Sequence, residues 1–487
     1  MRVTNTYAEA LAGLYTPWKG AQFPLPEVLR FNEDLGEELC LPASWSQDPG
    51  TASILTGTSP LPGGIPLAQA YAGHQFGHFS ASLGDGRALL IGEIVDRRGQ
   101  RRDLHLKGSG RTPYSRGGDG KAVLGPVLRE YLLGEAMHAL GVPTTRGLAV
   151  LLTGEQIPRE EFQPGAVLAR VAASHLRVGT FQYFAARGEH DKLRRLTDYT
   201  LERHDPDLSN QQDPAIPLLT AVIHRQVALV AKWMSIGFVH GVMNTDNTSI
   251  SGETIDFGPC AFIDAYAADA VYSSIDHQGR YAFGNQPAIL QWNMARFAES
   301  LLPLVDESQK DEALAQARDV IASIPLRFHD QWMREMTRKF GWESTEEGDA
   351  ILIQDALDLL EKSRVDFTVF FRRLAGALRG ESAGLTALFT EALPLKRWLE
   401  RFIARHGRER RSLTETADSM DRINPLVIPR NHHVDDALRA ATVSMDLSRF
   451  DDLLTAVRTP YDPPEHKPVL ADPPAPGSPP ITTFCGT

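Results

Sequence analysis

The residues with the clearest chemical potential lie in two short stretches near the middle of the chain. The first runs from His240 to Asn247 (HGVMNTDN), and the second, Asp256 to Gly258 (DFG), begins nine residues later. Asn247 offers an amide oxygen and Asp256 offers a carboxylate. Oxygen atoms of this kind are the protein ligands of Mg²⁺, which usually also binds phosphate groups. We therefore expect Asn247 and Asp256 to bind a divalent cation, Mg²⁺ or Mn²⁺.

The spacing of these residues matches part of a protein-kinase active site. Kinases carry His-x-Asp, an Asn five residues further on, and a downstream Asp-Phe-Gly; the Asn and the last Asp bind metal. His240, Asn247 and Asp256 are all in position, but Val242 stands where the catalytic Asp belongs. Asp246 is a nearby carboxylate, and it would serve either as a general base or as a support for the loop. The pattern indicates a nucleotide enzyme that is not an ordinary kinase.

A kinase-like site also needs a Lys on a strand paired with a Glu on a helix. The alternation in Arg102–Lys107 predicts a strand that ends at Lys107. Glu130 lies on the next predicted helix, Leu124–Leu140, and we favour it over Glu135 as the partner because it is closer to the helix start. The simpler alternative is that Lys107 is a surface lysine of the strand.

A local excess of positive charge surrounds this lysine. Between Arg97 and Lys121 there are eight Lys or Arg and two Asp, a local net charge of +6 in a chain whose net charge is −11. The segment is either a solvated basic loop or a wall that binds phosphate groups. We single out five residues in and near this segment as candidate phosphate contacts: Gly84, Gly86, Arg87, Asp119 and Gly120. Glycines allow the backbone to approach a phosphate closely, although the stretches that contain these residues could equally form plain turns.

Two arginines follow in the next predicted strand and just beyond it. Arg170 lies in the apolar segment Ala166–Ala172, where an unpaired guanidinium would be costly, so we expect an anionic partner for it. That partner is either a structural carboxylate or a phosphate, which Arg recognises through two parallel hydrogen bonds. Arg177, seven residues later, is the second candidate.

The order of the predicted elements is strands first and helices afterwards, with the candidate site residues near the junction. This predicts an α+β, two-lobed, protein-kinase-like fold with a strand-rich N-lobe and a large helical C-lobe. We expect an N-terminal extension at 1–60, the N-lobe at 61–165, the C-lobe at 166–459 and a Pro-rich tail at 460–487. Clefts between such lobes are the usual place for ligands.

The composition restricts the class of protein. Hydrophobic residues make up 42% and charged residues 23% of the chain, which is typical of a soluble globular enzyme. The net charge of −11 argues against nucleic acid and anionic membranes as partners. We see neither a secretory signal nor an apolar run that approaches twenty residues. A cytoplasmic location is therefore expected.

With these residues in view, the chain resembles the selenoprotein O family, the pseudokinase-fold protein adenylyltransferases that are known in bacteria as YdiU. The resemblance extends over nearly the whole chain. The motifs that carry it are YAGHQFGH from Tyr71, KGSGRTPYSR from Lys107, DG from Asp119, REYL from Arg129, PTTR from Pro143, HGVMNTDN from His240, DFGP from Asp256 and NPLVIPRNHH from Asn424.

The resemblance implies transfer of AMP from ATP to Ser, Thr or Tyr hydroxyl groups of proteins, with release of pyrophosphate. In this family ATP is inverted relative to kinases, so that its α-phosphate faces the acceptor. The matching positions imply nucleotide contacts at Gly84, Gly86, Arg87, Lys107, Asp119, Gly120, Arg170 and Arg177, metal ligands at Asn247 and Asp256, a base at Asp246 and a Lys-pairing role for Glu130.

Three alternatives to AMP transfer stay open. Transfer of UMP from UTP with Mn²⁺ would use the same site. A kinase-like phosphotransferase is disfavoured by Val242, and a non-catalytic nucleotide-binding scaffold is disfavoured by the intact Lys107, Glu130, Asn247 and Asp256.

The resemblance also draws attention to two of the three cysteines. Animal members of the family carry selenocysteine near the C-terminus, and Cys485 occupies a similar place, while Cys260 directly follows the DFGP motif. We hypothesise that Cys260 and Cys485 form a reversible disulfide, because disulfides in cytosolic proteins are usually regulatory. The alternative is that both are free thiols and that Cys260 is simply buried.

Overall fold

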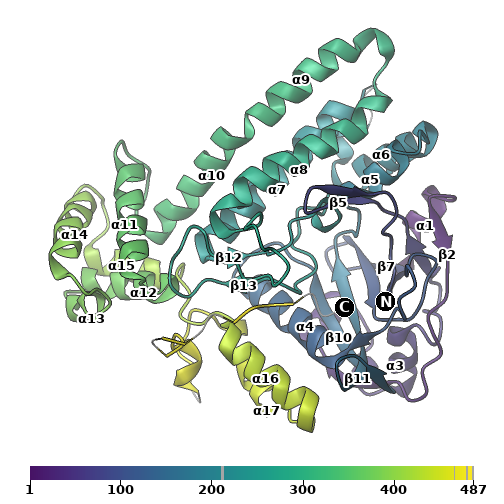
Figure 1. Cartoon of the computed structure of the whole chain (residues 1–487), viewed down its shortest axis with the longest axis horizontal. Helices are drawn as coiled ribbons and strands as arrows, with labels where there is room; N and C mark the ends of the chain where they lie inside the picture. Colours follow the sequence, from purple (N-terminus) through teal and green to yellow (C-terminus); the bar gives the residue numbers. More distant parts are fainter. Residues whose placement is uncertain (210–212, 465–466, 476, 479–480, 485–487) are drawn as a thin grey trace.

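The computed structural model describes the whole chain except residues 210–212, 465–466, 476, 479–480 and 485–487. A strand-rich N-terminal half forms one large antiparallel sheet, and the C-terminal half is mostly helical (Figure 1). The predicted α+β class, with a strand-rich N-lobe and a helical C-lobe, is confirmed.

Nine strands form the N-terminal sheet. Seven of them follow the order β2-β4-β7-β8-β11-β10-β3, while β1 pairs with β7 and β9 pairs with β11. The strands are β1 (Val3–Thr4), β2 (Tyr15–Pro17), β3 (Glu27–Phe31), β4 (Leu67–Gln69), β7 (Ala88–Val95), β8 (Arg101–Lys107), β9 (Ala122–Val123), β10 (Arg146–Pro158) and β11 (Phe162–Ala172). Since β1 to β3 lie within residues 1–60, the segment that we predicted as an N-terminal extension supplies three strands of this sheet.

Strand β8 shows why the sequence turns charged side chains toward one face. Leu104 and Leu106 are fully buried and belong to the apolar cluster that also contains Leu55 of α3 (Pro49–Thr56). Alternate side chains of a strand point to opposite faces. His105 and Lys107 therefore project from the other face of the sheet, as the alternation predicted.

Strands β10 and β11 form a long hairpin, in which β11 begins before the predicted strand Ala166–Ala172 and ends with it. Pro158 pairs with Phe162 at its end, after a register shift between Leu152 and Gln156. Backbone pairing thus continues beyond Leu152 and Ala166 toward the end of the hairpin, where Ile157 is buried. Since β11 runs to Ala172, we propose that the N-lobe ends after this residue rather than after residue 165.

Helix α4 (Leu124–Ala139) carries Glu130 and packs against β10 and β11. It begins and ends close to the predicted Leu124–Leu140, with Pro126 in its first turn and Gly141 just beyond its end at a φ of +71°. Proline suits the first turn of a helix because the amide hydrogens there have no partner within the helix. Glycine suits the position just after a helix because it adopts the left-handed backbone conformation that often ends a helix.

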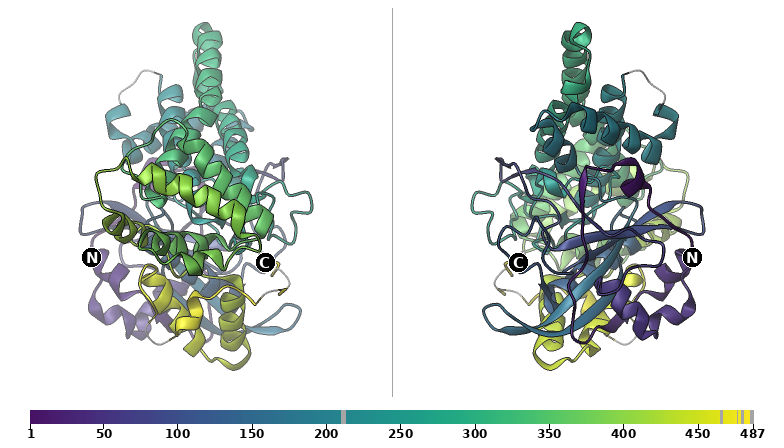
Figure 2. Two further views of the ribbon diagram at one scale, coloured as in Figure 1. Left: turned by 90° about the vertical axis from the view of Figure 1, so that its left-hand side faces the viewer. Right: turned by 90° about the vertical axis from the view of Figure 1, so that its right-hand side faces the viewer.

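The last two helices return to the N-terminal half. Helices α16 (Asn431–Ser444) and α17 (Ser448–Arg458) pack against α4, and Figures 1 and 2 show them at the same end of the molecule as the sheet. Val434 and Phe450 share an apolar cluster with Leu128 of α4. The end of the predicted C-lobe therefore supports the helix that carries Glu130.

Helix α7 (Ala215–Ile236) is, among the helices described, the one that is long and apolar enough to cross a membrane. It packs against α8 and α10, and most of its buried apolar side chains belong to an apolar cluster that also includes Leu67 and Leu133 of the N-terminal half. Helix α9 projects beyond the rest of the molecule at the top of Figure 1 and of both views in Figure 2. A cytoplasmic location stays a prediction.

The other helices follow from their amphipathic patterns. They are α1 (Thr6–Ala10) and α2 (Glu33–Glu38) beside the sheet, and then α5 (Val178–Ala185), α6 (His190–His204), α8 (Gln286–Leu301), α9 (Lys310–Ala322), α10 (Ile324–Lys339), α11 (Asp349–Ser363), α12 (Phe367–Leu378), α13 (Ser382–Thr386), α14 (Ala392–His406) and α15 (Leu413–Asp421). Two further two-stranded sheets are formed by β5 (Gly73–Gln75) with β6 (His78–Ser80) and by β12 (Phe238–Val239) with β13 (Ala261–Phe262).

Candidate active site

A cavity of about 460 Å³ lies between the sheet and the helical half. Its volume is within the range of small-molecule binding sites. The predicted nucleotide, metal, base and Lys-pairing residues all line it, and they come from both halves of the chain: Gly84, Gly86, Arg87, Lys107, Asp119, Gly120, Glu130, Arg170, Arg177, Asp246, Asn247 and Asp256.

Asp256 is the centre of a cluster of charges in this cavity. Its Oδ1 accepts hydrogen bonds from Lys107 Nζ and, at 2.9 Å, from Arg170 Nη1, while its Oδ2 accepts one from Arg177 Nη1 at 3.1 Å. Burial favours the neutral acid, but these three cations hold the pKa of Asp256 well below its usual value. Asp256 is therefore ionised at neutral pH.

Glu130 is the second carboxylate of the cluster. Lys107 Nζ donates to Glu130 Oε2 at 2.6 Å, and Arg170 Nη1 donates to Glu130 Oε1 at 2.7 Å. Although burial opposes ionisation, Lys107 and Arg170 keep the pKa of Glu130 below its usual value. Glu135, the competing candidate, instead pairs with Arg146. Three cations thus meet two carboxylates, which leaves a net positive charge on this wall of the cavity.

Arg177 is a cation of this cluster with a buried donor that has no partner among the described residues. It is 3% exposed, its Nη1 also donates to the backbone oxygen of Asp246 at 2.9 Å, and its guanidinium lies 4.6 Å from the ring centre of Tyr71. Its Nε is buried without a hydrogen-bond partner among the described residues. A buried, unpaired donor of this kind costs free energy unless a ligand accepts its hydrogen bond.

The backbone is strained where it surrounds the cavity. Six non-glycine residues of the described chain have a positive φ, and three of them, Phe76 (51°), Arg116 (49°) and Asp256 (63°), line the cavity. Such conformations cost about 1–3 kcal/mol each and are concentrated at functional sites. The strain at Asp256 indicates that its position is fixed by the ion pairs rather than by the backbone alone.

The HGVMNTDN loop follows β12, and two of its side chains fix its shape. His240 does not line the cavity; its Nε2 donates to the backbone oxygen of Ile255 at 2.9 Å and so joins this loop to the residue before Asp256. Asn247 Nδ2 donates to the backbone oxygen of Val242 at 3.0 Å. The amide oxygen of Asn247 is therefore the atom that it can offer to a cation.

Asp246 lies in the same loop and is almost inaccessible to solvent. Its Oδ2 accepts a hydrogen bond from Gln75 Nε2 at 3.3 Å, and its Oδ1 has no partner among the described residues. Burial raises the pKa of Asp246 to about 6, even though Arg177 favours the ionised form. A carboxylate whose pKa is close to neutral is well suited to accept a proton.

The glycines of the site leave no room for side chains. A Cβ on Gly84 would lie 2.3 Å from the ring of Tyr114, and one on Gly120 would lie 2.3 Å from the backbone of Gly110. Gly84 and Gly120 also have φ values of +63° and +70°, which favour glycine. A Cβ on Gly86 would lie 2.8 Å from the backbone oxygen of Tyr114. The loop 108–121 therefore packs directly on the turn before β7.

Asp119 lies at the rim of the cavity rather than in the charge cluster. Its carboxylate forms an ion pair with Arg159 at 2.8 Å, and its side chain is 43% exposed. Arg87 lines the cavity, and its backbone oxygen accepts a hydrogen bond from the amide of Gly108 at 2.7 Å.

The donor set fits a cation that is shared with phosphate groups. No group of three or more His, Cys, Asp or Glu side chains within the described ranges is arranged to hold a metal ion alone. Asp256 and Asn247 both line the cavity and carry oxygen atoms of the kind that bind Mg²⁺, and Oδ1 of Asp246, which has no partner among the described residues, lies on the same loop as Asn247. Mg²⁺ is commonly held by one or two protein ligands together with substrate phosphates.

Several residues at the site were missed by the sequence reasoning. Gln75, Tyr71 and Tyr114 line the cavity, and Gln75 contacts the candidate base directly. Gln75 and Tyr71 belong to the YAGHQFGH motif, so a signal existed, but the motif assigned no role to either. Arg159, the partner of Asp119, had no sequence signal because it follows β10, 40 residues further along the chain.

The cysteine hypothesis falls partly outside the described residues. Cys260 is buried, its Sγ donates to the backbone oxygen of Phe257 at 3.1 Å, and burial raises the pKa of its thiol to about 12. Thr483 Oγ1 donates to the backbone oxygen of Pro259 at 2.6 Å, so the described end of the chain lies next to Cys260. Cys485 lies outside the described residues, and its pairing with Cys260 stays a prediction.

The comparisons with known proteins agree with this geometry. A family model described as "Protein adenylyltransferase SelO" matches residues 2–458. A "Protein nucleotidyltransferase YdiU" of Cereibacter sphaeroides is 51% identical over 488 residues, which cover 100% of this chain and 99% of that protein. Proteins of the same name from Rhizobium meliloti and Agrobacterium fabrum are 50% and 48% identical; each match covers 100% of this chain, and 99% and 100% of the two relatives. The chain therefore belongs to the SelO (YdiU) family of protein nucleotidyltransferases, as its resemblance to that family predicted.

Proposed function

We propose that this chain transfers AMP from ATP to the hydroxyl group of a Ser, Thr or Tyr residue in a protein, with release of pyrophosphate. The observation that carries this proposal is the buried carboxylate of Asp246, which has a raised pKa and an unpartnered oxygen among the described residues. It lies in the cavity whose lining also includes Lys107, Arg170 and Arg177, the three cations that pair with Asp256. Membership in the family supports nucleotidyl transfer in general.

The reaction that we propose is an in-line displacement at the α-phosphorus. The acceptor oxygen forms a bond to this phosphorus, while the bond from phosphorus to the bridging oxygen of the leaving pyrophosphate breaks. Asp246 accepts the hydroxyl proton, and pyrophosphate takes the electron pair of the broken bond. Lys107, Arg170 and Arg177 neutralise the charge of the β- and γ-phosphates, as fixed donors do where charge develops.

Asn247 and Asp256 would hold Mg²⁺ or Mn²⁺ beside the phosphates. When bound, the metal ion would supply further neutralisation of phosphate charge. To bind this ion, Asp256 would have to give up some of its hydrogen bonds with Lys107, Arg170 and Arg177. This exchange is favourable only if the three cations gain other anionic partners. The phosphates of the nucleotide are such partners, so we expect metal and nucleotide to bind together.

The proposed role of Asp246 predicts a pH dependence. Burial raises the pKa of Asp246 to about 6, so below this pH its carboxyl group carries a proton and accepts no other. We expect kcat/KM for transfer to fall about tenfold per pH unit below pH 6 and to level off above it. Initial rates between about pH 5 and 8 measure this. A rate that stays constant down to about pH 5, with unchanged affinity for ATP, would contradict the role.

Product analysis tests the proposed reaction against phosphorylation. The protein is incubated with ATP and Mg²⁺, with the chain itself and a bacterial lysate as acceptors, and the nucleotide products are separated. The proposal predicts pyrophosphate in the same amount as protein-bound AMP. Formation of ADP with protein-bound phosphate would overturn it, and the same assay with UTP and Mn²⁺ tests the transfer of UMP.

A further inference from the structure

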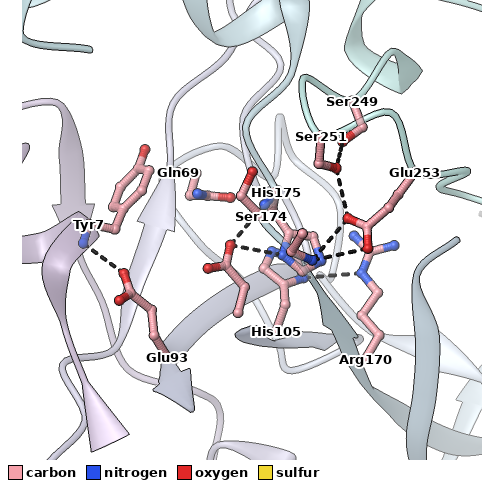
Figure 3. A network of polar contacts seen from close by, with 12 residues as sticks. Tyr7, Gln69, Glu93, His105, Arg170, Ser174, His175, Ser249, Ser251 and Glu253 are labelled. Carbon is pink, nitrogen blue, oxygen red and sulfur yellow. Dashed lines mark hydrogen bonds and ion pairs between the residues drawn. The ribbon is translucent and has the colours of Figure 1, made fainter. Parts of the chain in front are cut away.

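His105 lies directly behind Arg170 in the sheet. The two residues are cross-strand partners on β8 and β11, so their side chains share one face. Arg170 Nε donates to His105 Nδ1 at 3.2 Å, and His105 Nε2 lies 3.3 Å from Asp85 Oδ2. Figure 3 shows His105 and Arg170 side by side with this contact. All three side chains are at most 2% exposed.

These contacts determine the tautomer of His105. A guanidinium is always charged and only donates, so Nδ1 of His105 must accept the hydrogen bond from Arg170. The ring proton is then on Nε2, from which it is donated to the carboxylate of Asp85. Asp85 is in turn fixed by the amide of Gln69, which donates to its Oδ2 at 3.0 Å. A chain of hydrogen bonds thus runs from the backbone of β4 to Arg170.

The ring of His105 is also held by stacking. The rings of His105 and His175 lie 4.1 Å apart with an interplanar angle of 16°. His175 is held by Asp103, whose Oδ2 accepts from the backbone amide of His175 at 2.8 Å. Burial lowers the pKa of His105, which agrees with a neutral ring between Asp85 and Arg170. The ring therefore has neither rotational freedom nor a second protonation state at neutral pH.

This arrangement leaves Arg170 one group for a ligand. Its Nε is held by His105 and its Nη1 by Glu130 and Asp256 at 2.7 and 2.9 Å. Toward the residues that the structure describes, Nη2 makes no hydrogen bond, so it is the remaining donor of a guanidinium that lines the cavity. Fixing one edge of a planar guanidinium also fixes the direction of its other donors, and a donor fixed before binding loses little entropy when the ligand arrives.

We propose that His105 is a positioning residue for nucleotide binding and transfer, which acts by accepting the Nε hydrogen of Arg170 and so orienting this arginine toward the phosphates of the nucleotide. The inference rests on the proposed function. Asp85 supports it from behind by fixing the tautomer, in the way that carboxylates orient the histidines of metal sites.

Two amide substitutions of His105 separate this role from simple packing. In His105→Asn the amide oxygen lies near the position of Nδ1 and accepts from Arg170. In His105→Gln the amide lies near Nε2, so the contact with Asp85 is kept and that with Arg170 is lost. We expect His105→Gln to weaken ATP binding and to lower kcat/KM by about 10-fold or more, the range for a hydrogen bond to a charged group, and His105→Asn to recover most of the loss.

The measurements are ATP affinity by calorimetry, transfer of the α-phosphate, and the thermal midpoint of each variant. Equal losses of ATP affinity and kcat/KM in His105→Asn and His105→Gln, in proportion to the decrease in their thermal midpoints, would show a packing role and overturn the proposal. Wild-type affinity and kinetics in His105→Gln would also overturn it. In an Arg170→Lys background, which lacks the Nε donor, the two variants are expected to differ no longer. If this background does not fold, the comparison of the single variants still decides.

The two proposals fail in different ways. If the wild-type protein binds ATP but transfers no α-phosphate, the proposed function fails, and the ATP affinities of the two His105 variants still test the positioning role. If transfer occurs and His105→Gln leaves affinity and kcat/KM unchanged, only the positioning role fails.

Discussion

Replacing Asp246 with Asn is expected to lower the rate of nucleotidyl transfer by about 10²- to 10⁴-fold, the contribution typical of a general base. Asn is nearly the same size as Asp but accepts no proton at neutral pH. A side chain of different shape would not fit, because the Cβ of an alanine at position 73 would already lie 2.5 Å from Asp246 Oδ1. The affinity for ATP is expected to stay near its wild-type value, since the cations of the cavity are unchanged.

The same substitution is expected to stabilise the fold at neutral pH. The pKa of Asp246 rises from 3.8 to about 6 on folding, chiefly because of burial. The native state thus binds the proton more tightly, so the ionised group lowers stability as the pH rises through this range. The penalty is absent below about pH 4 and complete above about pH 6, and at 1.36 kcal/mol per pKa unit it is at most about 3 kcal/mol.

Urea unfolding of the wild type and of Asp246→Asn at two pH values measures this effect. We expect the variant to be more stable by about 1–3 kcal/mol at pH 7.5 and by much less near pH 4.5. An inactive variant that is also less stable at pH 7.5 would show that Asp246 supports the loop rather than serving as a strained, functional carboxylate. Full activity of the variant would exclude the base role outright.

Replacing Asp256 with Asn is expected to separate ATP binding from catalysis. The substitution removes the proposed metal ligand, and loss of a charge-stabilising group of this kind is expected to lower transfer by about 10²- to 10³-fold or more. It also removes the carboxylate that pairs with Lys107, Arg170 and Arg177. These cations then have Glu130 as their remaining carboxylate in the cluster, so metal-free ATP is expected to bind at least as tightly as it binds to the wild type.

Calorimetric titration with ATP in the presence of a chelator, together with the transfer assay in Mg²⁺, measures both effects. Asp269→Asn is the matched control, because it makes the same change at an exposed Asp that lies 13 residues further along the chain, beyond β13. This control is expected to behave like the wild type. Weaker metal-free ATP binding by Asp256→Asn would contradict the view that Asp256 and the phosphates share the same three cations.

The parts of the site that depend on local sequence could be predicted. The alternation in β8 turns Lys107 to the polar face, and the spacing of His240, Asn247 and Asp256 within two short loops needs no knowledge of distant contacts. The position of Glu130 on α4 followed from the helical pattern. For Lys107 and Glu130, neighbouring residues determine the local backbone, and the local backbone determines the direction of the side chain.

The parts that depend on contacts between distant segments could not be predicted. Gln75 reaches Asp246 across 171 residues, and its hairpin, β5 with β6, is too short to have a clear pattern. Strands β1 to β3 were missed because each is five residues or shorter and is stabilised by its partner strand rather than by its own sequence. The partners of Arg170 were left open between carboxylates and phosphate for the same reason.

The most direct test of the account uses ATP labelled separately on its α- and γ-phosphates, with Mg²⁺ or Mn²⁺, on the wild-type protein and on Asp256→Ala. Label that reaches protein from the α-phosphate alone, and is lost in Asp256→Ala, is the result that nucleotidyl transfer predicts. Label from the γ-phosphate alone would make the protein a kinase and contradict the inverted nucleotide. No label from either position, on the protein itself or in a lysate, would favour a nucleotide-binding scaffold.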